Sequence, residues 1–274
     1  MLGIISIVIW SAALREDRHG LLTVSFLDVG QGEAIFIDAP SGRQVLIDGG
    51  PDSSVLRELG KVMPWYDRSI DIIVATHPDD DDISGLIDVL QRYKVDAVVR
   101  SSVESSSPQW TALKQQMSDK AKGGMKVVTA QRGQMIELGK GVYIEMLSPD
   151  RPVPSTDPNT GCVVMRLVYG ATSFMLPCDA PQDLEEYLAY LDGKNLHANA
   201  LLAGKSGART SSSRLFVGFV APQYVVYSRG CNNKDGDPQP ETLATMARFN
   251  IAAEDTCTSG TVTFVSDGNT VAVH

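Results

Sequence analysis

The order in which the expected strands and helices follow one another is the feature that most restricts the fold. The first half begins with three short extended segments, LTVSFL (22–27), EAIFID (33–38) and QVLID (44–48). Alternating helical and extended segments follow, and the second half repeats this general order. Two packed sheets with helices on both outer faces accommodate this order better than a single doubly wound parallel sheet. We therefore expect an α/β fold with that layered architecture.

The remaining elements follow from apolar periodicity and turn residues. Helices are expected over residues 52–63, 83–93, 109–120, 181–191 and 240–249, and TSSS (210–213) is typical of a helix start. Further strands are expected over 70–75, 95–99, 127–129, 142–147, 162–169, 172–176, 196–202, 224–227, 261–265 and 270–273. No composition break lies between residues 21 and 274, which indicates one domain.

The first 20 residues differ in character from the rest. LGIISIVIWSAAL (2–14) is mostly apolar and is followed by the charged REDR (15–18). A spanning helix needs about 20 apolar residues, and no basic side chain precedes the run as it would in a signal peptide. We interpret residues 1–20 as the end of a membrane helix or a weak anchor plus linker, with Trp10 at the interface. A buried or frayed helix is the alternative.

A short acidic segment comes directly after the apolar run IDIIVA. THPDDDDISG (76–85) contains one histidine and four consecutive aspartates, whose charges repel one another and require a counter-charge, open water or a metal. His77, Asp79, Asp81 and Asp82 place nitrogen and oxygen donors in a short length of chain, as a divalent cation requires. The start of the next helix also favours nearby negative charge. A solvated acidic loop that caps the helix is the alternative interpretation.

The overall charge limits the choice of partners. The net charge is −9, which argues against a broad electropositive surface that grips nucleic acid through its phosphates. A nuclease is still compatible with this charge, because a metal can supply positive charge locally.

The four cysteines form no C-x-x-C pair, which argues against a zinc knuckle or a thioredoxin-like motif. A hairpin turning at 170–171 would bring Cys162 near Cys178, where a disulfide must meet tight geometry. We expect these two cysteines to be reduced and buried. Cys231 and Cys257 flank the last expected helix and could pair if the domain is exported.

A series of sequence blocks resembles a known family. The blocks are FLDVGQGEA (26–34), LIDGG (46–50), ATHPDDDDISGL (75–86), SFMLPCDA (173–180), GKSGARTSSS (204–213), SRG (228–230) and GDPQPE (236–241). Their order and spacing resemble the metallo-β-lactamase-like C-terminal domain of ComEC-type DNA-internalization competence proteins, over nearly the whole chain. The resemblance implies an αββα sandwich of two mixed sheets and a dinuclear metal site. It also implies a phosphodiesterase activity that degrades one DNA strand during uptake.

The first metal motif of that family is nearly complete in this chain. His77, Asp79 and Asp81 match it, whereas Asp82 stands where the last histidine is expected. Asp179 keeps the position of the bridging aspartate, although PCD replaces the family's T-G-D. These five residues are therefore candidate metal ligands, and His77 and Asp81 are also the candidate catalytic residues.

The later blocks lack the family's histidines. GKSGA (204–208) has lost both histidines of G-H-H-G-S, and Asp237 stands in place of the histidine before P-x-P-E. The remaining donors, with Asp237 as a further carboxylate, suit Mn²⁺, Mg²⁺ or Ca²⁺ better than Zn²⁺. The other possibility is that no metal binds and that the ammonium of Lys205 neutralises part of the acidic cluster. A plain surface lysine is the alternative for Lys205. We expect a degenerate site rather than an intact one.

Residues beside these blocks are candidates for substrate binding. They are Lys205, Ser206, Arg209 and Ser211. Arg209 and Arg229 could hold a phosphate, or pair with acidic neighbours.

Two functions are compatible with these observations. The first is a metal-dependent phosphodiesterase or nuclease of the DNA-uptake lineage with an impaired metal site. The second is a non-catalytic module for assembly or DNA guidance at a membrane channel. The expected partners are single-stranded DNA and a channel portion of the same or a partner chain, with no nucleotide cofactor. The expected location is at a membrane, with the domain outside the cytoplasm. Asp28 and Asp48 are expected to shape loops under the site. A β-lactamase or other small-molecule hydrolase is a third, weaker interpretation, because fold alone does not set substrate.

Overall fold

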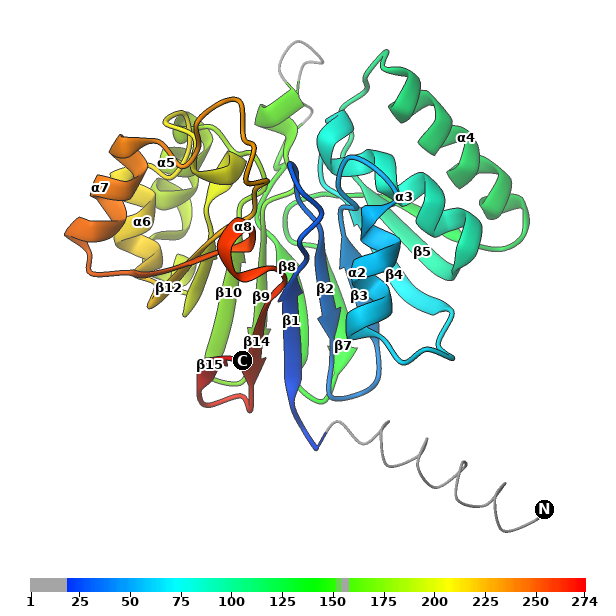
Figure 1. Ribbon diagram of the computed structural model, residues 1–274, viewed down its shortest axis with the longest axis horizontal. Coiled ribbons are helices and arrows are strands. Elements are labelled where there is room, and N and C mark those ends of the chain that lie inside the picture. Colours follow the sequence, from blue (N-terminus) through cyan, green and yellow to red (C-terminus); the bar gives the residue numbers. More distant parts are fainter. Residues whose placement is uncertain (1–18, 152, 154–157) are drawn as a thin grey trace.

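The computed structural model describes residues 19–151, 153 and 158–274. Two sheets pack face to face, and helices cover both outer faces (Figure 1). This arrangement confirms the expected sandwich of two mixed sheets. The interpretation of residues 1–20 as a membrane anchor falls almost entirely outside the described residues. Within those residues, no helix has the length and apolar character that crossing a membrane requires.

The first sheet joins an antiparallel meander to a parallel part. Its spatial order is β15 (Val271–Val273), β14 (Val262–Ser266), β1 (Leu22–Phe26), β2 (Ile35–Asp38), β3 (Gln44–Ile47), β4 (Ser69–Ala75), β5 (Lys94–Arg100) and β6 (Lys126–Thr129). Pairing is antiparallel from β15 to β3 and parallel from β3 to β6.

The second sheet combines the same two kinds of pairing. Its spatial order is β13 (Ala252–Asp255), β12 (Tyr224–Tyr227), β11 (Ala200–Leu202), β10 (Thr172–Leu176), β9 (Met165–Tyr169), β8 (Val142–Met146) and β7 (Met135–Gly139). Pairing is parallel from β13 to β10 and antiparallel from β10 to β7.

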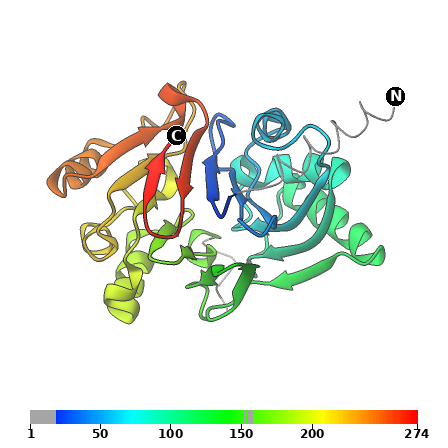
Figure 2. The same ribbon diagram turned by 90° about the horizontal axis from the view of Figure 1, so that it is seen from below.

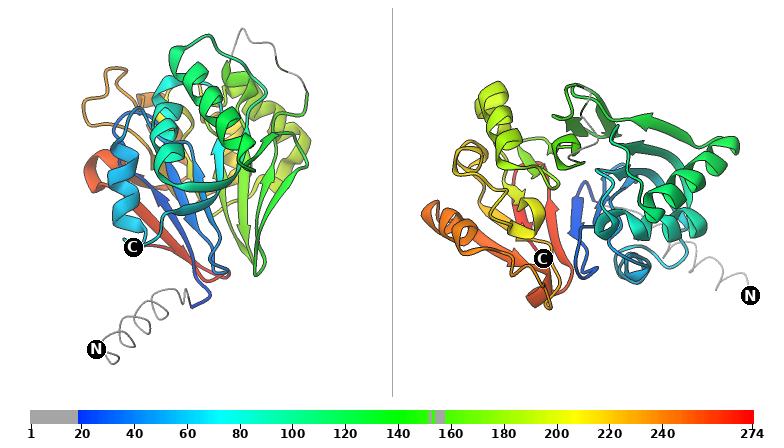
Figure 3. Two further views of the ribbon diagram at one scale, coloured as in Figure 1. Left: turned by 90° about the vertical axis from the view of Figure 1, so that its right-hand side faces the viewer. Right: turned by 90° about the horizontal axis from the view of Figure 1, so that it is seen from above.

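The helices divide between the two outer faces, as Figures 2 and 3 show. The first sheet is covered by α2 (Ser54–Val62), α3 (Asp80–Arg92) and α4 (Pro108–Lys122). The second sheet is covered by α5 (Gln182–Asp192), α6 (Arg214–Val220) and α7 (Pro240–Arg248). Shorter elements are η1 (Pro158–Gly161), η2 (Gly193–Leu196), η3 (Gly204–Gly207) and α8 (Thr256–Ser259).

Three apolar clusters hold these layers together, one between the sheets and one beneath each set of helices. An aromatic group lies in the central cluster. The ring of Phe264 lies 5.8 Å from that of Phe26, 5.9 Å from Phe174 and 5.5 Å from Tyr224, in edge-to-face geometry. Strands from both sheets contribute to this contact, which fixes the sheets against each other and so positions the loops at their ends.

Candidate metal centre

Loops from both sheets meet in an acidic pocket of about 80 Å³. The loops follow β1, β4, β10, β11 and β12. Their pocket-lining residues are Gln31, Gly32, Glu33, Asp79, Asp81, Asp82, Asp179, Lys205, Ser206, Asp235 and Asp237. Five of the six candidate metal ligands therefore line this pocket. The sixth, His77, does not line it but lies beside Asp82 and Asp179.

The aspartate run is partly helical. The Asp79 carboxylate accepts a hydrogen bond from the Asp81 amide at 3.0 Å and caps α3, which begins at Asp80. The expected helix start at residue 83 is therefore three residues too late. Asp80, Asp81 and Asp82 lie in the first turn, where the helix N-terminus reduces the mutual repulsion of their charges.

Two glycines allow the first turn of α3 to pack against neighbouring loops. A Cβ atom on Gly32 would lie 1.9 Å from the Asp81 carbonyl oxygen, and one on Gly85 would lie 2.0 Å from the Gly49 carbonyl oxygen. The Gly49 amide donates a hydrogen bond to the Asp82 carbonyl at 2.7 Å. The loops after β1 and β3 thereby hold the carboxylates of α3 in place.

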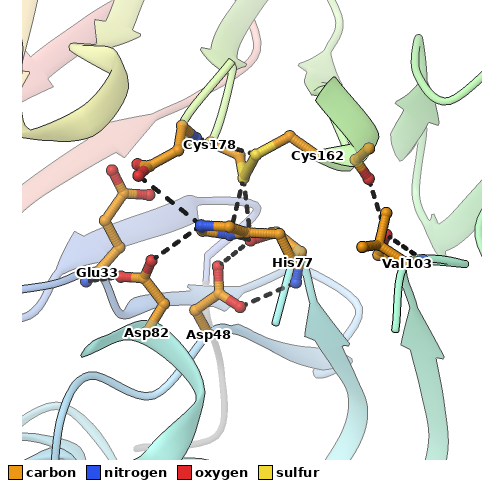
Figure 4. The surroundings of a disulfide bond; sticks show 11 residues. Glu33, Asp48, His77, Asp82, Val103, Cys162 and Cys178 are labelled. Atoms are coloured by element: carbon orange, nitrogen blue, oxygen red, sulfur yellow. Dashed lines mark hydrogen bonds and ion pairs between the residues drawn. A yellow bond between two sulfur atoms is a disulfide. The ribbon is translucent and has the colours of Figure 1, made fainter. Parts of the chain in front are cut away.

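His77 is buried, with 1% of its surface exposed. Its Nδ1 lies 3.1 Å from the Thr76 hydroxyl, which in turn donates to Asp48 Oδ2 at 2.6 Å. Because the single hydroxyl hydrogen is used on Asp48, Nδ1 carries the hydrogen of its own bond to Thr76. Nε2 therefore faces the acidic residues, 3.5 Å from Asp82 Oδ2 and 3.7 Å from Asp179 Oδ2 (Figure 4).

Burial dominates the electrostatics of this cluster. It raises the pKa of Asp82 and of Glu33 well above the usual range, and neighbouring carboxylates add to both effects. It also raises the pKa of Asp48 to about 7. Burial lowers the pKa of His77, but the nearby Asp179 carboxylate, followed by those of Asp82 and Asp48, outweighs it and raises that pKa to about 10. Without a cation, the cluster is thus stabilised by bound protons.

The donor set fits one divalent cation. Ligand atoms of His77, Asp79 and Asp179 all lie within 4.8 Å of one another. Among the described residues, Nε2 of His77 is buried without a hydrogen-bond partner, so a cation that replaces its proton would supply the contact that this nitrogen lacks. The carboxylate of Asp82 lies beside the same nitrogen. One nitrogen among several carboxylate oxygens favours a hard cation over zinc.

Lys205 and Ser206 also line the acidic pocket. Lys205 is exposed and adopts a left-handed backbone, and within the described chain it forms no ion pair within 4.0 Å. Burial raises the pKa of Asp237, and the charge of Lys205 is among the influences that lower it. The Ser206 hydroxyl donates to the Ser228 carbonyl at 2.7 Å, so it holds the loop in place.

Arg209 and Ser211 lie elsewhere. Both line a larger cavity bounded by α5, α6 and α7, and neither lines the acidic pocket. The structure thus separates the four candidate substrate-binding residues into two places. Arg229 makes two hydrogen bonds to Asp255 Oδ2, at 2.8 and 2.6 Å, so the alternative of an acidic partner holds for this arginine.

A disulfide joins Cys162 to Cys178 beside His77 (Figure 4). The expectation of two reduced cysteines is therefore wrong. Sγ of Cys178 lies 3.2 Å from Nδ1 of His77, and Sγ of Cys162 accepts a hydrogen bond from the Asp179 amide. Since a disulfide sulfur carries no hydrogen, Cys178 only contacts the histidine and leaves the Nδ1 bond to Thr76 intact.

A second disulfide, Cys231–Cys257, joins the loop after β12 to α8, with the two Cα atoms 4.8 Å apart. This loop also contains Asp235 and Asp237. The link therefore limits the movement of one acidic wall of the pocket.

Sequence reasoning missed Glu33. It is 5% exposed, its amide donates to Asp82 Oδ1 at 2.7 Å, and its Oε1 has no hydrogen-bond partner. The sequence contained a signal for this residue. Glu33 directly follows DVGQG and precedes an apolar strand, and a carboxylate at such a strand end is expected to be buried.

These features define the class of protein. Residues 27–206 match the family model described as the metallo-beta-lactamase superfamily, and the chain belongs to that superfamily. Two solved structures share the fold. CmlA, a diiron beta-hydroxylase from Streptomyces venezuelae, has a TM-score of 0.56 at 14% identity, with coverage of 85% of this chain and 52% of that one. Igni18, a metallo hydrolase from Ignicoccus hospitalis, has a TM-score of 0.57 at 15% identity, with coverage of 88% and 98%.

Curated relatives narrow the class to distant homologues of competence proteins. The chain is 25% identical over 263 residues to ComE operon protein 3 of Bacillus subtilis, covering 88% of this chain and 32% of the relative. It is 26% identical over 265 residues to Recombination protein 2 of Haemophilus influenzae, covering 95% and 31%. Competence protein ComA of Neisseria gonorrhoeae is 26% identical over 245 residues, with coverage of 88% and 32%. The chain spans about a third of the length of these relatives.

Proposed function

We propose that this domain acts in DNA uptake and hydrolyses phosphodiester bonds of a single DNA strand with one divalent cation, Mn²⁺ or Mg²⁺. The observation that carries the proposal is the buried Nε2 atom of His77, which has no hydrogen-bond partner and faces Asp82 and Asp179. The oxygen-rich donor set supports the choice of cation. The similarity to competence protein ComA supports the choice of process.

Each residue has a distinct role in this proposal. His77, Asp79 and Asp179 would hold the cation, with Asp82 beside them. A bound divalent cation supplies a Lewis acid for a phosphoryl oxygen. Asp81 is exposed at the mouth of the pocket, where it would accept the proton of the attacking water. Lys205 would contact a phosphate oxygen of the strand.

The domain would work beside a membrane channel portion of the same or a partner chain. The two disulfides support a place outside the cytoplasm, because such bonds persist in oxidising compartments.

The test combines cation binding with cleavage. Metal-stripped protein is titrated with Mn²⁺ by calorimetry and is then incubated with a labelled single strand. The wild type is expected to bind one Mn²⁺ and to cleave, whereas Asp179→Asn loses both properties. Asp96→Asn, which changes an exposed aspartate on β5 outside the pocket, is expected to keep both. Folded protein that binds no Mn²⁺ contradicts the proposal, and cleavage that survives in Asp179→Asn indicates a contaminating nuclease.

A non-catalytic module is the second candidate, and the position of Lys205 on the pocket wall favours it. In that case the ammonium replaces a cation and stabilises the acidic cluster. Lys205→Ala would then lower the melting temperature in the presence of EDTA, whereas Lys126→Ala, which removes an exposed lysine from β6, would not. For the hydrolase, Lys205→Ala is instead expected to leave the melting temperature unchanged and to weaken strand binding.

A further inference from the structure

The cavity bounded by α5, α6 and α7, called the α5–α7 cavity below, has a volume of about 660 Å³. It shares no lining residue with the acidic pocket. Arg209, Arg214 and Arg248 line it, together with Leu215 and Phe249. A basic, partly apolar cavity is unexpected on a chain whose net charge is −9.

Within the part of the chain that the structure describes, the three arginines have no acidic partner. Most other described arginines are paired, such as Arg132 with Asp192. Among the described residues, the guanidinium groups without a hydrogen bond, ion pair or ring contact belong to Arg92, Arg209, Arg214 and Arg248. Three of these four lie in one cavity. Two glutamates also line it, Glu186 and Glu241, so the arginines leave one net positive charge.

The backbone that carries two of these arginines is held firmly. The Gln182 side-chain amide donates to the carbonyl groups of Arg209 and Ser211, at 2.9 and 3.3 Å. The buried Glu185 carboxylate accepts the amides of Ser212 and Ser213, at 2.8 and 2.6 Å. The cations that flank this segment are therefore presented at fixed places, which lowers the entropy lost on binding an anion.

An aromatic ring completes the cavity. Phe249 is 40% exposed and Leu215 is 48% exposed, so both offer apolar surface to a ligand in this cavity. Guanidinium groups that bind phosphates, next to an exposed ring on which a base can stack, are the combination found in proteins that bind single strands.

The cavity is also close to the acidic pocket along the chain. Lys205 lines the pocket and Arg209 lines the cavity, four residues apart. Four residues span at most about 14 Å. A short stretch of one DNA strand can therefore contact both places.

We propose that the α5–α7 cavity binds the backbone of a single DNA strand, with phosphates on Arg209, Arg214 and Arg248 and a base stacked on Phe249. The choice of DNA as the ligand rests on the proposed function. The cavity would hold the strand next to the acidic pocket without taking part in the chemistry.

Binding is measured by fluorescence anisotropy with a labelled oligothymidylate in EDTA, so that no cation-dependent step contributes. The test variant is Arg209→Ala/Arg214→Ala/Arg248→Ala. The matched control, Arg92→Ala/Lys126→Ala/Lys194→Ala, removes the same charge from other exposed positions. The test variant is expected to bind at least tenfold more weakly, and the slope of log K against log salt is expected to fall by about 2. The control is expected to keep the slope of the wild type.

Phe249→Ala tests the stacking contact. It is expected to weaken binding by about fivefold or more and to leave the salt slope unchanged, because no charge is lost. Thermal melts of all variants check that the exposed substitutions leave the fold intact.

Two results would overturn the inference. One is a test variant that binds the oligonucleotide no more weakly than the control. The other is wild-type protein that ignores the oligonucleotide but binds phosphatidylglycerol vesicles through these arginines, which would make the cavity a membrane contact. Failure of the proposed function would give a different result. Protein that binds the oligonucleotide in EDTA but does not cleave it in Mn²⁺ would refute the hydrolase proposal and would still support strand binding in the cavity.

Discussion

The amide nitrogen of Asp179 donates a hydrogen bond to Sγ of Cys162, 3.1 Å away. Cys178, the residue before Asp179, is covalently bound to that same sulfur. A carboxylate that faces His77 is therefore fixed by two connections to one cysteine, one covalent and one by hydrogen bond. The disulfide orients the candidate metal ligands as well as joining two loops.

Removal of this disulfide should affect both stability and cation binding. The bond closes a loop with a sequence separation of 16, for which the loss in unfolding free energy is about 3 kcal/mol. In Cys162→Ala/Cys178→Ala, we also expect Mn²⁺ affinity to fall by about tenfold or more, as for loss of a residue that orients a ligand. Urea unfolding and calorimetry measure the two effects. Cys231→Ala/Cys257→Ala is the control, with a similar loss of stability. Wild-type Mn²⁺ affinity in Cys162→Ala/Cys178→Ala would mean that the first disulfide has no orienting role.

The hydrogen bonds that join Asp48 to Thr76 and Thr76 to His77 should affect the affinity of the site for a cation. Asp48→Asn keeps the size of the side chain but weakens the acceptor of the Thr76 hydroxyl, and so loosens the orientation of the imidazole. We expect Mn²⁺ affinity to fall by about 10- to 100-fold. Asp71→Asn is the control, because Asp71 also accepts a backbone amide, that of Gln44, outside the pocket. An Asp48→Asn protein with wild-type affinity would exclude this orienting role.

Gly85 should not tolerate a side chain. A Cβ atom there would lie 2.0 Å from the Gly49 carbonyl oxygen and 2.5 Å from that of Asp52. Gly85→Ala is therefore expected to lower the unfolding free energy by about 3 kcal/mol, at the upper end of the usual cost of overpacking. Gly60→Ala, in an open position on α2, is expected to raise it by up to about 1 kcal/mol. Chemical denaturation measures the unfolding free energies of both variants. Equal changes in unfolding free energy would refute the close packing of α3.

Glu185 should contribute a pH dependence of stability. Burial raises its pKa to about 7, although the amides of Ser213 and Ser212 oppose the shift. Between its ordinary pKa and about 7, the folded state binds more protons than the unfolded state, so unfolding free energy falls as pH rises through this window. The full effect is about 3 kcal/mol between pH 4 and 8.

The variant Glu185→Gln isolates this contribution. Its unfolding free energy, measured relative to the wild type, is expected to rise across that pH range, because the amide does not ionise. Glu137→Gln, which changes an exposed glutamate on β7, is expected to follow the wild type at every pH. Parallel curves for the wild type and Glu185→Gln would show that folding does not raise the pKa of Glu185.

Much of the layered fold could be predicted because its strands are apolar and its turns are marked. The strand Ser69–Ala75 and its acidic continuation are an example. Strands β7 and β13 were missed. Burial alternates along the first, MIELG, but its residue types do not show this clearly, because Met135 is apolar and yet exposed. The second, AAED, is exposed or half-buried along its length. Its parallel pairing with β12, rather than its own residues, makes it a strand.

The site was predictable where its residues are adjacent in sequence and less so elsewhere. His77, Asp79 and Asp179 converge as the motifs indicated. Arg209 was grouped with Lys205 because only four residues separate them, yet the chain turns from the pocket to the outer face between the two. The hairpin expectation brought the first cysteine pair together, but spacing alone carries no information on oxidation.

The pairing of β1 with β14 has a consequence for folding during synthesis. Leu22 lies opposite Ser266, so β1 finds this neighbour only after nearly all of the domain that separates the two strands in sequence has been synthesised. Until then one edge of β1 is open, and open edges invite pairing with other chains. A ribosome that stalls before Val262 would release a nascent chain whose first sheet lacks two of its strands.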